Sequence, residues 1–274
     1  MSAPVSRAPF GRIDVSLTAI SSRMEGLAQV LSSLLAQDYP DFRVLLHLSR
    51  EPHLLDRGVP EPPDAVRRLA EESEGRLDLR YVPNWGPYRK LLPCLFEHWG
   101  RSQLVATADD DTIYPEGWLS GLAAAYGVYG CTIAQRGHRM SFDAAGRPTD
   151  YRGWMRARAT QTPGRLLLPT GKDGVLYNTA HFPVGVLDID TALRLTPTMD
   201  DLWFRWHLAS NGVPVHLIST DYTASTFEEA GYADSLYLTY NLSGGNDAAV
   251  AALEAHFARS TGWRMADLAR EERP

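Results

Sequence analysis

Apolar and polar residues alternate near the start of the chain. Residues 13–19 follow a two-residue period, which predicts a β-strand, and the polar turn Ser21-Ser22-Arg23 comes next. Apolar residues then recur at helical spacing over residues 24–35, and residues 42–48 predict a second strand. A strand, a helix and a strand in this order predict two parallel strands joined by a helical crossover.

The same patterns predict further elements along the chain. Four prolines between residues 52 and 63 indicate a surface loop, after which Asp64 is expected to cap a helix that ends near residue 74. Strands are predicted at 77–82, 104–108, 131–135 and 213–218, and helices at 90–99, 198–210 and 247–258. Strands that alternate with helices indicate an α/β fold with a mostly parallel central sheet flanked by helices. Because no linker or repeat divides the chain, we expect one domain over residues 1–274.

Charge and cysteine content narrow the possible functions. Lys and Arg number 27 against 33 Asp and Glu, and a net charge of −6 has the wrong sign for binding a phosphate polymer. We therefore expect no nucleic-acid partner. Cys94 and Cys131 have neither CxxC nor Cys/His spacing, so they are predicted to be reduced core thiols of a cytoplasmic protein.

The ends of the chain bear on its location. Residues 1–12 lack the apolar core of a secretion signal, and no run of 18 apolar residues predicts a membrane span. Phe257, Trp263 and several arginines near the C-terminus leave peripheral attachment at the inner face of the membrane open, although an ordinary amphipathic helix is the simpler explanation.

Three consecutive aspartates, Asp109, Asp110 and Asp111, follow the short apolar strand at 104–108. Their mutual repulsion is tolerated most readily when a divalent cation or a hydroxyl-rich ligand neutralises it. Either Asp109 and Asp111 approach one Mg²⁺ or Mn²⁺ ion, or Asp111 binds the ion while Asp109 bonds a ribose hydroxyl. The alternative is a solvated turn in which Asp111 helps to start the next helix.

Several segments together resemble a known family. The run LVATADDDTIYPEGWL at 104–119 resembles the strand, DxD turn and helix of GT-A glycosyltransferases, particularly family 2-like enzymes of bacterial surface polysaccharide synthesis. Residues 15–49 resemble the nucleotide-binding start of that family. GKDGVLY at 171–177 and PTMDDLWFRWHLASNG at 197–212 resemble its donor-side loop and its acidic acceptor-side helix. One departure is Ser49-Arg50-Glu51, which replaces the more usual acidic residue near the end of the second strand.

The resemblance implies a division of the chain and an activity. A nucleotide-binding lobe at about 13–113 and an acceptor-binding lobe at about 114–274 are expected. The implied reaction moves a sugar from a nucleotide-sugar donor to a glycan or lipid-linked acceptor, with inversion and with Mn²⁺ or Mg²⁺ as cofactor.

The resemblance also implies the donor side of the site. Asp111 and Asp109 hold the metal, while Asp109 and Asp110 contact ribose and donor sugar. The remaining implied donor-binding residues are Ser21, Arg23, Lys90 and Gly174. Lys90 precedes an apolar helix and Arg23 follows the first strand, so both suit a pyrophosphate or nucleotide, although surface positions explain either residue as well.

On the acceptor side, the family motif implies that Asp201 is the catalytic base and that Asp200 orients it or contacts the acceptor. Repulsion between the two carboxylates is expected to raise one pKa. The alternative is a plain helix start, with Thr198 as N-cap and Asp201 at the third helical position.

Four other residues are weaker candidates. His181 or His216 is a candidate third metal ligand, although a lone histidine is more often structural. Trp154 and Trp203 are candidates for a sugar-stacking platform, with core packing as the more common use of Trp203.

Three other functions were weighed. A non-catalytic sugar-nucleotide-binding scaffold stays open, but it gives no reason to keep five mutually repelling carboxylates. A DxD phosphohydrolase of the haloacid dehalogenase type is disfavoured by Ile113 and by the roughly hundred residues that precede the aspartates. A nucleotidyltransferase is expected to have a glycine-rich, arginine-containing loop after the first strand, and Ser21-Ser22-Arg23 is not such a loop.

Overall fold

The computed structural model describes residues 8–157, 159, 161–227, 236, 239–240 and 244–271. Within these residues one seven-stranded sheet has the order β3-β2-β1-β4-β8-β5-β9. Its first four strands along the chain are parallel: β1 (Ile13–Thr18), β2 (Phe42–Leu48), β3 (Leu77–Tyr81) and β4 (Leu104–Thr107). The α/β class with a mostly parallel central sheet is therefore confirmed, and the predicted strands lie within about a residue of the observed ones here.

The other half of the sheet contains a strand that the sequence pattern did not predict. β8 (Val175–Asn178) runs antiparallel between β4 and β5 (Thr132–Ala134), and β9 (Val215–Leu217) is parallel to β5. All four residues of β8 are buried, so the strand lacks the alternation of polar and apolar residues that marks a half-exposed one. β6 (Gly137–Arg139) and β7 (Leu167–Pro169) form a separate antiparallel pair.

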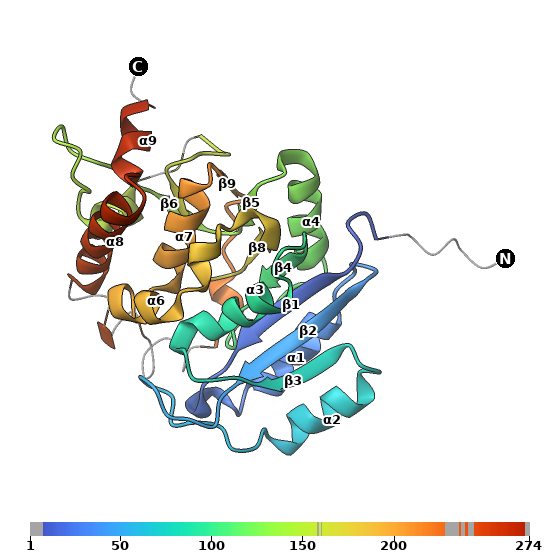
Figure 1. Cartoon of the computed structure of the whole chain (residues 1–274). Helices are drawn as coiled ribbons and strands as arrows, with labels where there is room; N and C mark the ends of the chain where they lie inside the picture. Colours follow the sequence, from blue (N-terminus) through green and yellow to red (C-terminus); the bar gives the residue numbers. More distant parts are fainter. Residues whose placement is uncertain are drawn as a thin grey trace.

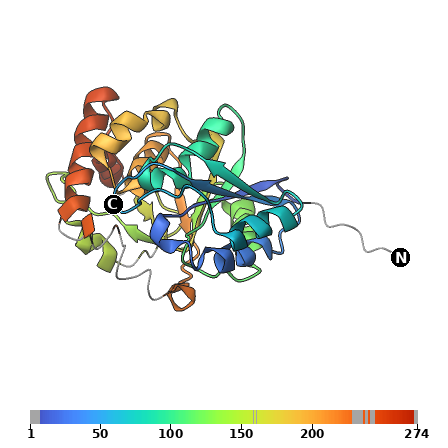
Figure 2. The ribbon, with the colours of Figure 1, turned by 90° about the horizontal axis from the view of Figure 1, so that it is seen from below.

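Helices cover both faces of the sheet, as Figure 2 shows. One apolar cluster joins one face to α1 (Leu27–Leu35), α2 (Asp64–Glu72) and α4 (Trp118–Tyr129). A second cluster joins the other face to α3 (Leu92–Glu97), α5 (Tyr151–Arg156), α6 (Ile189–Leu195), α7 (Asp200–Ser210), α8 (Asn246–Ser260) and α9 (Met265–Glu271). Because successive side chains of a strand point to opposite faces, Val105 belongs to the second cluster and Ala106 to the first.

Short 3₁₀ turns connect these elements, at η1 (Ser21–Arg23), η2 (Gly86–Lys90), η3 (Thr179–His181), η4 (Val184–Leu187) and η5 (Thr223–Ser225). The predicted helix at 90–99 is therefore a 3₁₀ turn followed by the shorter α3. The expectation that Asp64 caps its helix is wrong, because the N-cap position is Pro63 and Asp64 is the first helical residue. There its charge still favours the helix N-terminus.

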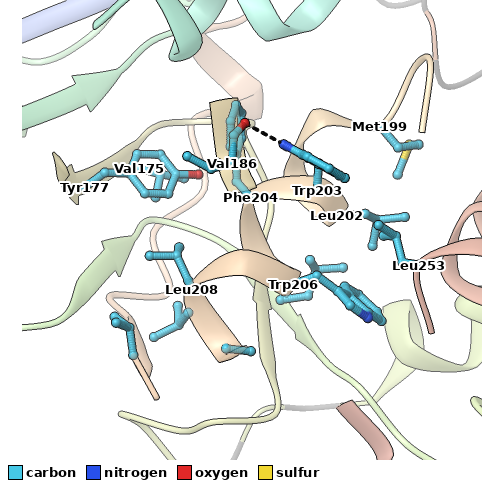
Figure 3. Close-up of a cluster of buried hydrophobic side chains, with 14 of the residues drawn as sticks. Val175, Tyr177, Val186, Met199, Leu202, Trp203, Phe204, Trp206, Leu208 and Leu253 are labelled. Carbon is cyan, nitrogen blue, oxygen red and sulfur yellow. Dashed lines mark hydrogen bonds between the residues drawn. The ribbon is translucent and has the colours of Figure 1, made fainter. Parts of the chain in front are cut away.

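The helix α7 is fixed in the core by its aromatic residues, which Figure 3 shows. The indole of Trp203 donates a hydrogen bond to the Val186 carbonyl at 2.9 Å, and the indole of Trp206 bonds Glu254 of α8 at 3.0 Å. Trp203 and Trp154 are fully buried, so the prediction of a sugar-stacking platform at these two residues is wrong. Both rings belong to the apolar core, and the bond from Trp203 to Val186 ties α7 to η4.

Helices α8 and α9, drawn in red, lie beyond α7 on the side of the molecule away from α2 (Figure 1). Phe257 of α8 is buried, which supports the simpler explanation of this amphipathic segment. Cys94 and Cys131 are free and buried, as predicted. None of the described helices is long and apolar enough to cross a membrane.

Candidate active site

The site lies at the edge of the sheet where the parallel strands β1, β2 and β4 end. Asp109, Asp110 and Asp111 follow β4 at this edge. Because β8 is antiparallel, it enters the sheet here, and Thr107 pairs with Val175. The turn before β8 therefore meets the aspartates, and the backbone N–H of Asp173 donates a hydrogen bond to Asp109 Oδ2 at 2.9 Å.

Two cations pair with the three aspartates. Arg23 Nη1 lies 2.7 Å from Asp110 Oδ1 and 2.6 Å from Asp111 Oδ2, and Lys90 Nζ lies 2.6 Å from Asp109 Oδ1. All five side chains are at least four-fifths buried. The structure thus brings the predicted donor-side residues Arg23 and Lys90 onto the aspartates, and a solvated turn does not describe this segment.

Burial and charge change the pKa values in this cluster. Burial, followed by the charges of Asp109 and Asp110, raises the pKa of Asp111 to about 6, although Arg23 and Lys90 oppose the rise. Burial by itself lowers the pKa of Lys90, but the charges of Asp109 and Asp200 outweigh it and the net effect is a raised pKa. Lys90 is therefore a firmly protonated ammonium group at neutral pH.

A pocket of about 190 Å³ opens beside these charges. Its wall combines apolar residues with ionic and polar ones. The lining comprises Thr18, Ile20, Arg23, His53, Leu54, Leu55, Asp56, Gly86, Pro87, Arg89, Lys90, Asp109, Asp110 and Leu236. An apolar wall next to a cluster of cations suits a ligand that has a flat organic part and a phosphorylated part.

Sequence analysis missed a buried ion pair in this pocket. Arg89 Nη2 lies 2.9 Å from Asp56 Oδ2, and the side chains are 1% and 2% exposed. Asp56 also accepts hydrogen bonds from the backbone N–H groups of Ser21 and Gly58 and from the Asn84 amide. Asp56 stands in the proline-rich loop, where no periodicity marked it, whereas Arg89 is the neighbour of the predicted Lys90.

Two predicted donor-binding residues have structural roles instead. The Ser21 backbone N–H bonds Asp56, and its hydroxyl accepts from the backbone N–H of Arg57 at 2.9 Å, so Ser21 fastens the loop after β2. Gly174 is buried with a φ of 109°, and a Cβ there would lie 2.5 Å from the Trp118 ring. Close packing and a left-handed backbone thus explain this glycine, and neither residue lines the pocket.

The second acidic group, Asp200 and Asp201, opens helix α7. The N-cap position is Met199, which makes no side-chain capping bond, so the predicted cap at Thr198 is wrong. Asp201 Oδ2 instead accepts the backbone N–H of Gly171 at 2.8 Å. A methyl group added to Gly171 would lie 3.1 Å from Asp201 Oδ1 and 3.6 Å from Lys90 Nζ, so this glycine lets the acid and the ammonium group approach.

Asp200 and Asp201 both have raised pKa values, so they hold their protons more tightly than ordinary aspartates do. Burial, followed by the charge of Asp200, raises the pKa of Asp201 to about 8, and the bond from Gly171 and the charge of Lys90 only partly oppose the shift. The pKa of Asp200 is raised as well, again chiefly by burial. The predicted effect of repulsion within the pair is thus present, with burial as the larger cause.

The arrangement does not fit the divalent cation that the resemblance implies. Carboxylate oxygens are suitable ligands for Mg²⁺ or Mn²⁺, but no three His, Cys, Asp or Glu residues of the described chain are grouped to hold an ion. Both predicted metal ligands already have a cation as partner, because Arg23 pairs with Asp111, as well as with Asp110, and Lys90 pairs with Asp109. The histidine candidates are used elsewhere: His216 bonds Thr162 and stacks on Tyr129, and His181 packs near Tyr126.

No protein-family model and no curated protein sequence matches this chain. Solved structures resemble it in fold. S. aureus TarS 1-349 is 16% identical with a TM-score of 0.45, and the match covers 92% of this chain and 73% of that chain. The same protein in complex with UDP-GlcNAc is 17% identical with a TM-score of 0.46. The 4-diphosphocytidyl-2C-methyl-D-erythritol synthase from Anaerococcus prevotii is 12% identical with a TM-score of 0.48, covering 80% of this chain and 92% of that chain.

Proposed function

We propose that this chain is a glycosyltransferase that moves a sugar from a nucleotide-sugar donor to a hydroxyl group of a glycan or lipid-linked acceptor. The observation that carries the proposal is the position of Lys90. Its ammonium group bonds Asp109 of the triplet and also interacts with the charges of Asp200 and Asp201. A cation is thus shared between a diphosphate-sized pocket and a protonatable acid, which is what transfer of a sugar from a diphosphate to a hydroxyl requires.

The pocket supports the donor half of the proposal. Arg23 and Lys90 present positive charge where the diphosphate would lie, and Ile20, Leu54 and Pro87 supply an apolar surface for a base. Arg89 lines this pocket, and its buried Nη1 has no hydrogen-bond partner among the residues that the structure describes. A buried donor without a partner is costly, so a ligand acceptor atom at this position is expected.

The acid pair supports the acceptor half. In the proposed step the acceptor O–H bond breaks and its proton passes to ionised Asp201, while the oxygen forms a bond to the anomeric carbon. The bond from that carbon to the diphosphate oxygen breaks, and the leaving diphosphate keeps the electron pair. Lys90 and Arg23 stabilise the charge that develops on it. One displacement inverts the configuration at the anomeric carbon.

The test combines binding and turnover. Nucleotide-sugars that bind the folded chain are expected to raise its melting temperature, and bound donors are then assayed for release of the nucleoside diphosphate in the presence of glycan or lipid-linked acceptors. Transfer by the wild-type chain supports the proposal. Binding of a donor without transfer to any acceptor would favour the non-catalytic scaffold, and absence of both would contradict a nucleotide-sugar site.

A further inference from the structure

The polar side chains of β1 are buried, although they alternate with apolar ones as they do on a half-exposed strand. Asp14 is 1% exposed and Ser16 is 0% exposed. The apolar residues of β1 belong to the cluster with α1, α2 and α4, so these polar side chains point to the opposite face, which α3 helps to cover. A buried polar group without a partner destabilises the fold, so each of them needs one.

Ser16 is bonded to both chain segments that form the ion pair between Lys90 and Asp109. Its hydroxyl donates a hydrogen bond to the Lys90 carbonyl at 2.7 Å. Its own backbone carbonyl accepts the N–H of Ala108, the residue before Asp109, at 2.9 Å. The ammonium group of Lys90 lies 2.6 Å from Asp109 Oδ1. One residue of β1 thus holds the two segments at a fixed distance from each other.

His47 of β2 orients the Ser16 hydroxyl. Its Nδ1 lies 3.2 Å from Ser16 Oγ. Because the Lys90 carbonyl can only accept, the single hydroxyl proton of Ser16 points to it, and His47 Nδ1 must carry the proton that Ser16 accepts. Burial, followed by the charge of Arg80, lowers the pKa of His47 to about 4, so the ring is neutral at pH 7 and Nε2 is unprotonated.

A serine beside a histidine also resembles a nucleophile beside its base. Here the hydroxyl proton is committed to a carbonyl, and both side chains are 0% exposed, so they cannot reach a substrate. Burial raises the pKa of the nearby Cys94 thiol to about 12, and its hydrogen bond with Ser16 only partly opposes the rise. A protonated, buried thiol is inert. These three side chains can therefore affect the reaction only through the residues that they hold in place.

We propose that Ser16, oriented by His47, is a positioning residue that places the Lys90 ammonium group where it can bind both Asp109 and a diphosphate. The inference rests on the proposed function, because it takes the pocket to hold a nucleoside diphosphate. A charge-assisted hydrogen bond depends on the distance and direction between its atoms. Without the Ser16 hydroxyl, the Lys90 backbone is released from β1 and the ammonium group moves with it.

The first experiment titrates the full chain with UDP and GDP as probes. Ser16→Ala is expected to bind the nucleotide that wild type binds about tenfold more weakly, because one hydrogen bond that places Lys90 is lost. Ser73→Ala is the matched control. Ser73 is 4% exposed, and its hydroxyl also bonds a backbone carbonyl, that of Ala70, so this change should cost stability but not affinity. Equal affinity of Ser16→Ala and wild type would overturn the proposal.

Two variants of His47 test its part. The side-chain amide of Asn places an N–H group near the position of Nδ1, whereas that of Gln reaches the position of Nε2. His47→Asn should therefore keep the affinity for the nucleotide, and His47→Gln should lose about as much as Ser16→Ala does. An equal loss in both variants would contradict the role of His47.

If these variants fail to fold, the wild-type chain still tests the arrangement. Nuclear magnetic resonance of the chain with ¹⁵N-labelled histidine should show the His47 ring protonated at Nδ1 and unprotonated at Nε2 between pH 6 and 8. The opposite tautomer would leave the Ser16 hydroxyl without its donor and overturn the proposal.

A last measurement needs no ligand, because Lys90 and Lys172 are the two lysines of the chain. With ¹³C-labelled lysine, Ser16→Ala should shift the Cε signal of Lys90 and leave that of the exposed Lys172 unchanged. An unchanged Lys90 signal would overturn the proposal. A chain that shows the shift but binds no nucleotide would remove the proposed function and leave the link from Ser16 to Lys90 standing.

Discussion

The two acidic groups of the site have the same chemistry but different partners. Arg23 and Lys90 contact all three carboxylates of the Asp109–Asp111 triplet directly, at 2.6 to 2.7 Å. Asp201 receives one backbone N–H, from Gly171, and interacts with Lys90 only through its charge. Direct ion pairs hold a carboxylate in its charged form, whereas burial without an ion pair favours the protonated form.

The comparison shows how one site provides two carboxylate functions. The triplet is equipped to bind cations or a donor, and its two cations limit the rise that burial causes in the pKa of Asp111, which stays at about 6. Asp201, with a pKa of about 8, is equipped to exchange a proton near neutral pH. If this division is correct, substitutions of Asp200 or Asp201 should affect turnover. Substitutions of Arg23 or Lys90 should affect donor binding as well.

The largest effect is expected for Asp201→Asn. An amide cannot accept the acceptor's proton, so turnover should fall by about a thousandfold, while the donor affinity should change little. Kinetic assays and donor titrations measure the two quantities separately. Asp190→Asn is the matched control, because Asp190 also lies in the first turn of a helix, α6. Near-full turnover of Asp201→Asn would remove this residue from the chemistry.

A smaller effect is expected for Lys90→Met. This change removes the cation shared by the two acidic groups, so donor affinity should fall by about ten- to a hundredfold. The positive charge of Lys90 also lowers the pKa of Asp201, and its loss should shift the rising limb of the pH–rate profile to higher pH. Lys172→Met, at an exposed lysine near the same turn, is the control. Loss of turnover with unchanged donor affinity would argue against a shared cation.

The pH dependence of turnover should distinguish the two groups further. A reaction that needs ionised Asp201 speeds up as the pH rises and levels off above about 8, roughly a tenfold gain from pH 7. Asp200→Asn removes a negative charge next to Asp201, which should lower the pKa of Asp201. The rising limb of the pH–rate profile should therefore move to lower pH by about one unit. A rate profile that is flat from pH 6 to 9, measured with saturating donor, would contradict the assignment of Asp201 as base.

A last prediction concerns stability. The pKa of Asp201 in the folded chain, about 8, exceeds the value near 3.9 of an unfolded aspartate, so the folded state binds the proton more tightly. This contribution is present below about pH 4 and is lost as the pH rises through about 8. On raising the pH from 5 to 8.5, the free energy of unfolding of Asp201→Asn should therefore rise by up to about 4 kcal/mol relative to that of wild type. Urea unfolding at both pH values measures the change, and an equal difference at the two would be inconsistent with a raised pKa.

Sequence patterns predicted the parallel half of the sheet well. The strands β1, β2 and β4 have periodic or continuous apolar runs, and the aspartates that follow β4 were placed correctly at the carboxyl edge. The resemblance also indicated Lys90 and Arg23, which the structure places on the triplet. These features could be predicted from the sequence because they depend on local periodicity and on the general geometry of parallel sheets.

The half of the molecule that contains β8 was predicted less well. β8 was missed because burial on both faces removes alternation, and Gly174 was interpreted as a donor contact although it packs on Trp118. Trp154 was misassigned for a related reason, since a tryptophan on a short helix gives no local sign of whether it faces a ligand or the core. Packing between distant segments decides these cases.

The sequence by itself determined the α/β class, the order of the first elements and the carboxylates available for chemistry. Only the tertiary structure decided which charges meet. Arg23 and Asp110 are 87 positions apart, as the chain runs, and Arg89 and Asp56 are 33 apart. A residue's pKa and its ability to hold a metal ion depend on burial and on charges within a few ångströms. Those distances are set when the strands and the turn before β8 come together at one edge of the sheet.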